Sequence, residues 1–329
     1  MNNPLINTLK LHICEEIKAT HPQLEAAVDF ICDSHLDSNH YAMPLHSETS
    51  ETYLALLQAR EFQAAEAKLK FEDTKTIEGI IRVMVRTHLN RQGVANIVQG
   101  ARYKTMAKRV LAPFTGAFDY AAMLNHEYFI ECFEQAAMAY PQEYRESDIQ
   151  DIQVAKKLTG NQRFSMPAAK AAGVSDNWAK VLTGIYSGLL FLHNEYQFNP
   201  DKIWKAMDAC VNDAEKSKRL TKKVQSGIHQ YGTALAGSFL ADLGHDAFLK
   251  PDVHVIASVS AIHNQANVCD QFALNYTHKL AQALGMPPRM LDKVFYIGCS
   301  GNLYLYDMKI RNAAQSKRKF LDKLDELSL

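Results

Sequence analysis

The sequence has little of what marks a membrane-bound, secreted or metal-dependent protein. Across its 329 residues no apolar run approaches eighteen residues, and its first five residues, MNNPL, lack the basic and then apolar order of a secretory signal. Its six cysteines, at positions 14, 32, 132, 210, 269 and 299, form no CxxC pair and no close cluster. Neither a disulfide framework nor a metal site is therefore predicted. We expect a cytoplasmic protein that makes no contact with a membrane.

The sequence is also poor in the alternating Val, Ile and Thr runs that form strands. Apolar residues instead recur at three- and four-residue spacing almost throughout, as in residues 53–65 and 203–211. Two segments have the chemistry of helix starts: Asn199 before Pro200, and Ser175 before an Ala- and Leu-rich run that reaches about residue 192. The pattern predicts an all-α fold, and the length allows two helical lobes.

Interruptions of the apolar pattern indicate where the chain divides. The polar, acidic stretch 140–148 suggests an N-terminal helical region, 1–145, and a C-terminal one, 146–329, which we expect to share an interface. An ordinary surface loop is the alternative interpretation of that stretch. Glycines in 285–288 and 298–301 are expected to separate further helices near the C-terminus.

Residues 220–262 have a specific order of elements: a basic helix end, a glycine-bearing turn, an apolar helix, a loop, and Pro-Asp at a helix start. The turn is S-G-I-H-Q-Y-G at 226–232. Such a turn directs backbone N–H groups at a phosphate, because glycine allows close approach and positive φ while the second helix offers its first amides. The candidate phosphate-binding residues are Gly227, Ile228, His229, Gln230, Gly232 and Thr233, with Lys216, Lys218, Arg219, Lys222 and Lys223 adding a nonspecific electrostatic attraction.

The segment K-P-D-V-H-V at 250–255 completes this order. Together the turn, the small-residue helix after it and this segment resemble the helix-hairpin-helix superfamily named for its Gly/Pro-Asp motif, which includes the endonuclease III, adenine and 8-oxoguanine DNA glycosylases. The resemblance covers residues 220–262. It implies a two-lobed helical fold, double-stranded DNA with an extruded nucleotide as the partner, and Asp252 as the catalytic residue.

In that family the aspartate faces the sugar of the extruded nucleotide. The resemblance therefore implies that Asp252 stabilises an oxocarbenium-like transition state and positions or deprotonates a nucleophile. Extrusion is needed because the glycosidic bond cannot be reached inside the base stack. The alternative is that Asp252 is only an N-cap after Pro251. The two roles are compatible, because the family's aspartate also lies at a helix start.

The chain departs from the family at the lysine that forms a Schiff base in bifunctional members. Depending on the register, that position holds Ala234 or Tyr231, and no lysine lies between Lys223 and Lys250. A monofunctional reaction with water is therefore the better inference. Lys250 and Tyr231 remain reserve catalytic candidates, although Lys250 can also be interpreted as an exposed loop lysine.

A second departure concerns cysteine. The endonuclease III and adenine branches carry four cysteines after this region, which hold an iron–sulfur cluster, whereas only Cys269 and Cys299 follow it here. The cluster is therefore not expected, and no other cofactor is predicted. The absence of these cysteines makes the chain more similar to the 8-oxoguanine or alkylbase branches, without selecting between the two.

A second candidate DNA contact lies in residues 75–109, where eight Lys and Arg accompany a single acidic residue, Glu78. Its segment 86–93 interrupts two helices and resembles the family's loop whose Asn or Gln fills the gap left by the flipped base. The candidate residues are Asn90, Arg91 and Gln92. An ordinary solvated surface is the alternative. The distance to the turn implies an insertion within 112–170.

Three functions follow from these features. The leading prediction is a monofunctional DNA N-glycosylase that flips and excises a damaged or modified base. The second is a transferase on the same fold that replaces a pyrophosphate on a hypermodified pyrimidine of phage-type DNA with an amine. The third is a DNA-binding protein without catalysis, in which Asp252 only caps a helix. Each would act in the cytoplasm, on the nucleoid or inside a phage host.

Overall fold

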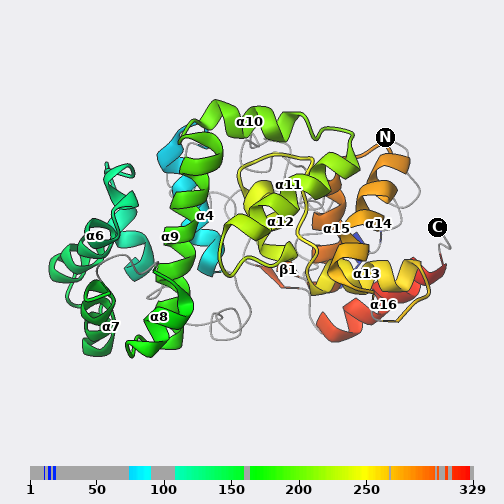
Figure 1. The fold of residues 1–329 in the computed structure, drawn as a ribbon. Coiled ribbons are helices and arrows are strands. Elements are labelled where there is room, and N and C mark those ends of the chain that lie inside the picture. The colour runs from blue at the N-terminus through cyan, green and yellow to red at the C-terminus, as the bar shows by residue number, and fades with distance from the viewer. Residues whose placement is uncertain are drawn as a thin grey trace, which may run out of the picture. The chain divides into compact units, whose positions relative to one another are not determined.

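The computed structural model describes parts of residues 11–19 and then residues 74–89, 108–158, 164–266, 268–300, 302–303, 308–309 and 313–326. Helices are the main regular structure of these residues, so the predicted all-α class is confirmed (Figure 1). The exception is a short antiparallel pair of β1 (Asn302–Leu303) with β2 (Met308–Lys309). None of the described helices combines the length and apolarity needed to cross a bilayer.

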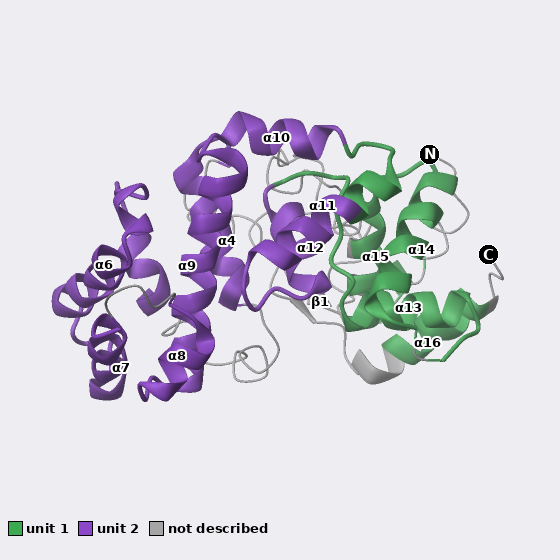
Figure 2. Cartoon of the chain, viewed as in Figure 1, with its two compact units in different colours: residues 1–71, 210–218, 244–329 green, residues 72–209, 219–243 purple. Residues whose placement is uncertain are grey.

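The chain divides into two compact units (Figure 2). Unit 1 contains residues 1–71, 210–218 and 244–329, and unit 2 contains residues 72–209 and 219–243. The boundary expected at residues 145 and 146 falls inside unit 2. The helix expected over residues 53–65 lies outside the described residues.

Unit 2 is built around one long helix, α9 (Asp176–Tyr196). The helices α4, α7, α8 and α10 pack against it, and α12 packs against α4. The other elements of the unit are α4 (Ile77–Leu89), the short 3-10 helices Ala112–Phe114 and Ala122–Leu124, α6 (His126–Ala139), α7 (Glu146–Lys156), α8 (Met166–Ala171), α10 (Pro200–Asp208), the second half of α11 (Ala214–Gly227) and α12 (Thr233–Asp242).

Two glycines of α9 allow α4 to approach closely. A Cβ at Gly184 would lie 2.4 Å from the ring of His88, and a Cβ at Gly188 would lie 2.2 Å from the sulfur of Met84. Both α4 side chains are fully buried. The small residues of α9 therefore set the spacing of the central helix pair of unit 2.

The predicted helix starts are confirmed at both positions. Helix α10 begins at Pro200, and the side chain of Asn199 accepts the N–H of Lys202 at 3.3 Å. Helix α9 begins directly after Ser175, but the Ser175 hydroxyl does not cap it and donates instead to Asp151 at 2.6 Å. The end of α10 at residue 208 leaves residues 209–211 of the expected helix outside it.

The acidic stretch 140–148 contains a buried charge of unit 2. Asp148 is fully buried and accepts hydrogen bonds from Arg109 Nη1 at 2.8 Å, Arg145 Nη2 at 2.9 Å and Trp178 Nε1 at 2.8 Å. Burial by itself would raise the pKa of Asp148, but the hydrogen bonds from Arg145 and Trp178, with the charge of Arg109, together lower it. This stretch therefore anchors α7 in the core.

In the described part of unit 1, four helices surround one apolar core. They are α13 (Val253–Ile262), α14 (Asp270–Ala283), α15 (Pro288–Ser300) and α16 (Ala313–Glu326), and α13 and α15 each contact the other three. The core includes Val255 and Val259 of α13, Phe295 of α15 and Phe320 of α16, all fully buried.

The helix break expected at 298–301 is present, because α15 ends at Ser300. Gly298 itself lies inside α15, where it is used for packing and not for a turn. A Cβ at Gly298 would lie 2.4 Å from the ring of Phe320. The glycine therefore lets α16 approach α15. The break expected at 285–288 is present, since α14 ends at Ala283 and α15 begins at Pro288.

Candidate functional site

The residues singled out for phosphate binding join two helices. Helix α11 ends at Gly227, α12 begins at Thr233, and residues 228–232 form the turn between them. The turn is fixed from inside, because Ile228 is fully buried and the N–H of His229 donates to the Ser187 hydroxyl at 2.8 Å. The side chains of His229 and Gln230 are exposed.

The glycines of this turn do not take the conformation expected for them. The left-handed backbone lies at Gln230, with φ of 70°, whereas Gly232 is extended at φ of −85° and ψ of 179°. Gly227 is required for packing, because a Cβ there would lie 2.1 Å from the ring of Phe191. A Cβ at Gly232 would meet nothing within 4 Å. Of the two glycines, Gly232 is the one with open space for a ligand.

The N-terminus of α12 has no side-chain cap. Its N-cap is Gly232, which has no side chain to accept the first helix amides, and Thr233 that follows is buried. Amides at a helix N-terminus carry a partial positive charge and need an acceptor from elsewhere.

Tyr231, a reserve catalytic candidate, is part of the core of unit 2. It is 5% exposed and its hydroxyl donates to the carbonyl of Met84 at 3.0 Å, while burial raises its pKa well above the ordinary value. Its ring also contacts His88, with the centroids 4.7 Å apart. This geometry gives Tyr231 a packing role.

The basic residues before the turn are partly neutralised. Lys216 pairs with Asp213 at 3.0 Å, Lys218 lies 3.8 Å from Glu215, and Lys223 pairs with Glu195. Lys222 and Arg219 are exposed and have no carboxylate partner among the described residues. The electrostatic attraction expected of five cations therefore rests mainly on two.

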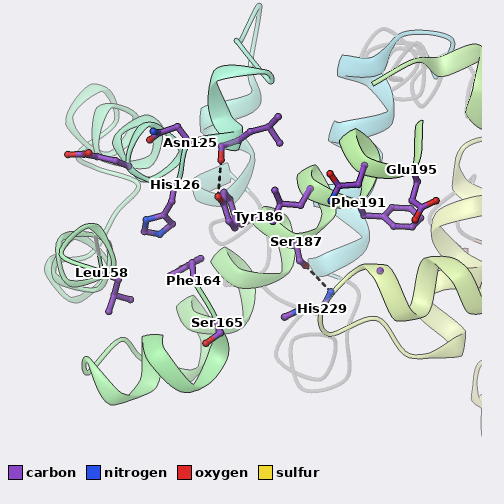
Figure 3. Close-up of a pocket in the computed structure, with 15 residues that line it drawn as sticks. Asn125, His126, Leu158, Phe164, Ser165, Tyr186, Ser187, Phe191, Glu195 and His229 are labelled. Atoms are coloured by element: carbon purple, nitrogen blue, oxygen red, sulfur yellow. Dashed lines mark hydrogen bonds between the residues drawn. The ribbon is translucent and has the colours of Figure 1, made fainter. Parts of the chain in front are cut away.

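A cavity of about 680 Å³ adjoins the turn inside unit 2 (Figure 3). Gly227 and His229 line one side of it. The rest of the lining comes mostly from the start of α6 and the middle of α9, with the aromatic rings of Phe164, Tyr186 and Phe191. Its hydrogen-bonding groups include Asn125, His126, Ser165 and Asn194, and its carboxylates are Glu127 and Glu195.

The described lining of this cavity is aromatic and polar, and it holds carboxylates but no cationic side chain of Lys or Arg. The ring of His126 contacts that of Phe164 at a tilt of 42°, with centroids 4.4 Å apart, and its Nε2 is buried with no hydrogen-bond partner among the described residues. Burial lowers the pKa of His126. The cavity therefore suits a planar, uncharged group better than a phosphate.

Asp252 lies in unit 1 as the N-cap of α13. Its Oδ1 accepts the N–H groups of His254 at 2.9 Å and Val255 at 3.4 Å, so the predicted cap is confirmed. Its other oxygen, Oδ2, lies 3.9 Å from Lys250 Nζ, and 18% of the side chain is exposed. One carboxylate oxygen thus holds the helix while the other receives no backbone hydrogen bond.

The segment before Asp252 is a tight turn held by a second carboxylate. The N–H of Asp252 donates to the carbonyl of Lys250 at 2.7 Å across Pro251. The N–H of Lys250 donates to Asp292 Oδ2, on α15, at 3.1 Å. Burial, followed by the nearby charge of Asp252, raises the pKa of Asp292 to about 7.

The first turn of α13 is surrounded by further polar groups. Burial lowers the pKa of His254, whose Nδ1 is buried with no hydrogen-bond partner among the described residues and whose ring meets Tyr296 edge-on at 5.3 Å. The Cys299 thiol donates to the His254 carbonyl at 3.8 Å and contacts the Ser258 hydroxyl at 3.4 Å. Burial raises the pKa of Cys299 to about 11, so it remains a neutral thiol.

The sequence predicts Asp252, Lys250 and the turn as candidates, whereas Asp292 and the cavity are apparent only in the structure. Asp292 is 42 residues from Lys250, and only the packing of α15 brings it to the segment. No local pattern signals such a contact. The candidates Asn90, Arg91 and Gln92 lie outside the described residues.

Within the described part of the chain, no three His, Cys, Asp or Glu side chains come together as metal ligands. Compared with known proteins, the chain matches no protein family, no curated protein and no solved structure.

Proposed function

We propose that this chain is a monofunctional DNA N-glycosylase in which Asp252 acts on the sugar of an extruded nucleotide. The observation that carries the proposal is the geometry of Asp252: Oδ1 is held by two amides of α13, and Oδ2 has no backbone partner. A carboxylate fixed in this way keeps one lone-pair face for a ligand. It suits stabilisation of a positive charge that develops at an anomeric carbon.

The turn between α11 and α12 supplies the DNA contact in this proposal. Gly232 leaves the N-terminus of α12 uncapped and has open space around it, so a phosphate oxygen can accept the first amides. Lys222 and Arg219 add attraction that does not depend on sequence. Contacts of this kind hold the backbone without reading bases.

Taken within unit 2 alone, and independently of Asp252 in unit 1, the cavity beside the turn has side chains that suit a heterocycle. Phe164, Tyr186 and Phe191 offer aromatic surface, while Asn125 and Asn194 offer amide groups at the edge. Aromatic rings favour stacking with any base, and amides select among base edges. An unpaired base has both the shape and the polarity of such a site.

The reaction proposed here is hydrolysis. Water adds to the anomeric carbon, the glycosidic C–N bond breaks, and the base leaves with the bonding electrons and takes up a proton. Asp252 balances the positive charge on the sugar and orients or deprotonates the water. No lysine lies between residues 223 and 250, so the usual covalent step through a lysine amine is not part of the proposal.

The test is the substitution Asp252→Asn on the full chain. Asparagine is as good an N-cap as aspartate, so α13 should remain folded, whereas loss of the charge should lower the rate by about 100-fold or more. The substrates are duplexes that each carry one modified base. Abasic sites are measured by strand cleavage in alkali, and the DNA is also analysed by mass.

Asp325→Asn, in the same unit and exposed, is the matched control and should keep the wild-type rate. Abasic product that depends on Asp252 supports the proposal. An intact sugar with a changed base mass would replace it with the transferase alternative. DNA binding without any product, equal in wild type and Asp252→Asn, would leave a binding protein.

A further inference from the structure

Lys250 lies between two carboxyl groups in unit 1. Its backbone N–H donates to Asp292 Oδ2 at 3.1 Å, and its ammonium lies 3.9 Å from Asp252 Oδ2. Lys250 is therefore bound to Asp292 through the main chain and attracted to Asp252 through the side chain. The two carboxyls belong to different elements, the start of α13 and the middle of α15.

The hydrogen bond that Asp292 accepts does not require a charged side chain. Its task as an acceptor for one amide could be done by asparagine, which has a similar shape and no charge. A carboxylate at this place is desolvated and repelled by Asp252, and both effects raise its pKa, to about 7. Ionisation of Asp292 is thus opposed by burial and by Asp252, and it is favoured by the Lys250 amide and by nearby cations. A carboxyl with such opposing influences is typical of a group whose charge is used.

The charged groups around Asp292 determine how readily it ionises. Asp252 opposes ionisation of Asp292, whereas the Lys250 amide, the Lys250 ammonium and Arg289 favour it. In the neighbouring first turn of α13, the charge of Asp252 raises the pKa of His254, whereas burial and the charges of Lys317 and Lys250 lower it. Lys250 is the group that both carboxyls share.

We propose that Asp292 is a positioning residue for Asp252 and acts through Lys250: its hydrogen bond fixes the Lys250 backbone, and its carboxylate competes with Asp252 for the Lys250 ammonium. When Asp292 is neutral, Lys250 compensates the charge of Asp252. When Asp292 ionises, Lys250 is shared and Asp252 presents more uncompensated negative charge. The catalytic consequence rests on the proposed function of Asp252, whereas the hydrogen bond and the charge sharing do not.

The first arm of the test needs no DNA. Hydrogen exchange at the Lys250 amide is compared in wild type, Asp292→Asn, Asp292→Ala and the control Asp325→Asn. Alanine removes the acceptor and should speed exchange by about tenfold or more, while asparagine keeps the acceptor and should leave exchange within about twofold of wild type. Equal exchange in wild type and Asp292→Ala would overturn the role of the hydrogen bond.

The second arm follows Asp292 directly. In the full chain labelled with ¹³C at aspartate carboxyls, one carboxyl should titrate near pH 7 and be missing from the spectrum of Asp292→Asn. The Asp325→Asn protein should retain it. A wild-type spectrum in which every carboxyl titrates below about pH 5 would overturn the charge sharing.

The third arm is the pH profile of base release. The wild-type rate should rise about threefold to tenfold between pH 6 and pH 8 as Asp292 ionises, because more negative charge then faces the developing cation. Asp292→Asn should stay near the low-pH rate, and Asp292→Ala should fall a further tenfold or so at every pH because the segment is misplaced. A purely structural Asp292 would give Asp292→Asn the wild-type profile.

The arms separate the two proposals. If no DNA product forms in wild type, the glycosylase proposal fails, while hydrogen exchange and the carboxyl titration still decide whether Asp292 positions the Lys250 segment. If Asp292→Ala does not fold, Asp292→Asn alone decides the charge sharing, because it retains the hydrogen-bond acceptor.

Discussion

The two units treat a carboxyl packed among helices in opposite ways. In unit 2, Asp148 is surrounded by Arg109, Arg145 and the Trp178 indole, and the result is a pKa below the ordinary value. In unit 1, Asp292 receives one backbone amide and faces Asp252, and its pKa is raised to about 7. The first carboxyl stabilises the fold, whereas the second opposes folding once it is ionised.

The difference indicates where each unit can do chemistry. A carboxylate whose lone pairs are all occupied by donors has nothing left for a ligand, as with Asp148. The unit 1 cluster contains Asp252 with an oxygen to spare and His254 with a buried nitrogen that has no partner among the described residues. Hydrogen-bonding atoms without a protein partner, together with perturbed pKa values, are typical of functional sites.

The largest effect is expected from Asp148→Ala. The substitution leaves Arg109 and the Trp178 N–H buried without their acceptor, and removal of one partner from such a network costs about 3–5 kcal/mol. Urea unfolding, with hydrogen exchange followed in α9, measures the loss. The exposed Asp176, which pairs with Lys170 and Lys180, is the matched control, and Asp176→Ala should change stability little. Equal losses at both positions would contradict the comparison.

An intermediate effect is expected from His278 of unit 1. His278 is 5% exposed, and burial lowers its pKa to about 4. Since the unfolded chain takes up a proton near pH 6.5 and the folded chain does not, the stability of unit 1 should fall as pH drops from about 6.5 toward 4.

His278→Leu should remove the part of that dependence that comes from His278 and leave the contributions of His254 and Asp292. Between pH 7 and pH 5 the wild type should lose about 1–2 kcal/mol more than the variant, measured by hydrogen exchange in α14. His263→Leu, at an exposed position, should retain the wild-type pH dependence. Equal changes in the free energy of opening of α14 with pH, in wild type and in His278→Leu, would show that His278 is not kept neutral by folding.

The smallest effect is expected at a helix cap of unit 2. Asn125 caps α6 by accepting the Tyr128 N–H at 3.1 Å, and Asn125→Ala should cost about 1 kcal/mol. Asn125→Asp keeps an acceptor and should cost far less. Because Asn125 also lines the cavity, a loss of ligand binding in Asn125→Asp without loss of stability would separate its two roles.

Much of the fold was predictable because it is local. The spacing of apolar residues predicts helices, and Asn199 with Pro200 marks the start of α10 through backbone chemistry that involves only neighbours. The cap at Asp252 follows from the same kind of reasoning. Gly298 shows the limit: a glycine in a helix can mean a break or a close packing contact, and only the position of Phe320 decides.

The candidate site was predictable only in part for the same reason. Asp252 belongs to a segment whose order is visible in the sequence, whereas Asp292 joins it through the packing of α15. Lys223 is among the cations that the sequence offers for DNA, but it pairs with Glu195 of α9. Ion pairs, cavities and shared hydrogen bonds depend on residues far apart in the chain, so spacing alone does not reveal them.

The two amides that hold Oδ1 of Asp252 also stop the carboxylate from rotating. A carboxylate on a free side chain must be turned toward its ligand each time, and the surrounding water must rearrange with it. At Asp252 the direction of the charge is set when α13 forms. The electric field of Oδ2 is thus present before any ligand binds. Folding orients the carboxylate, so each binding event needs little further reorganisation.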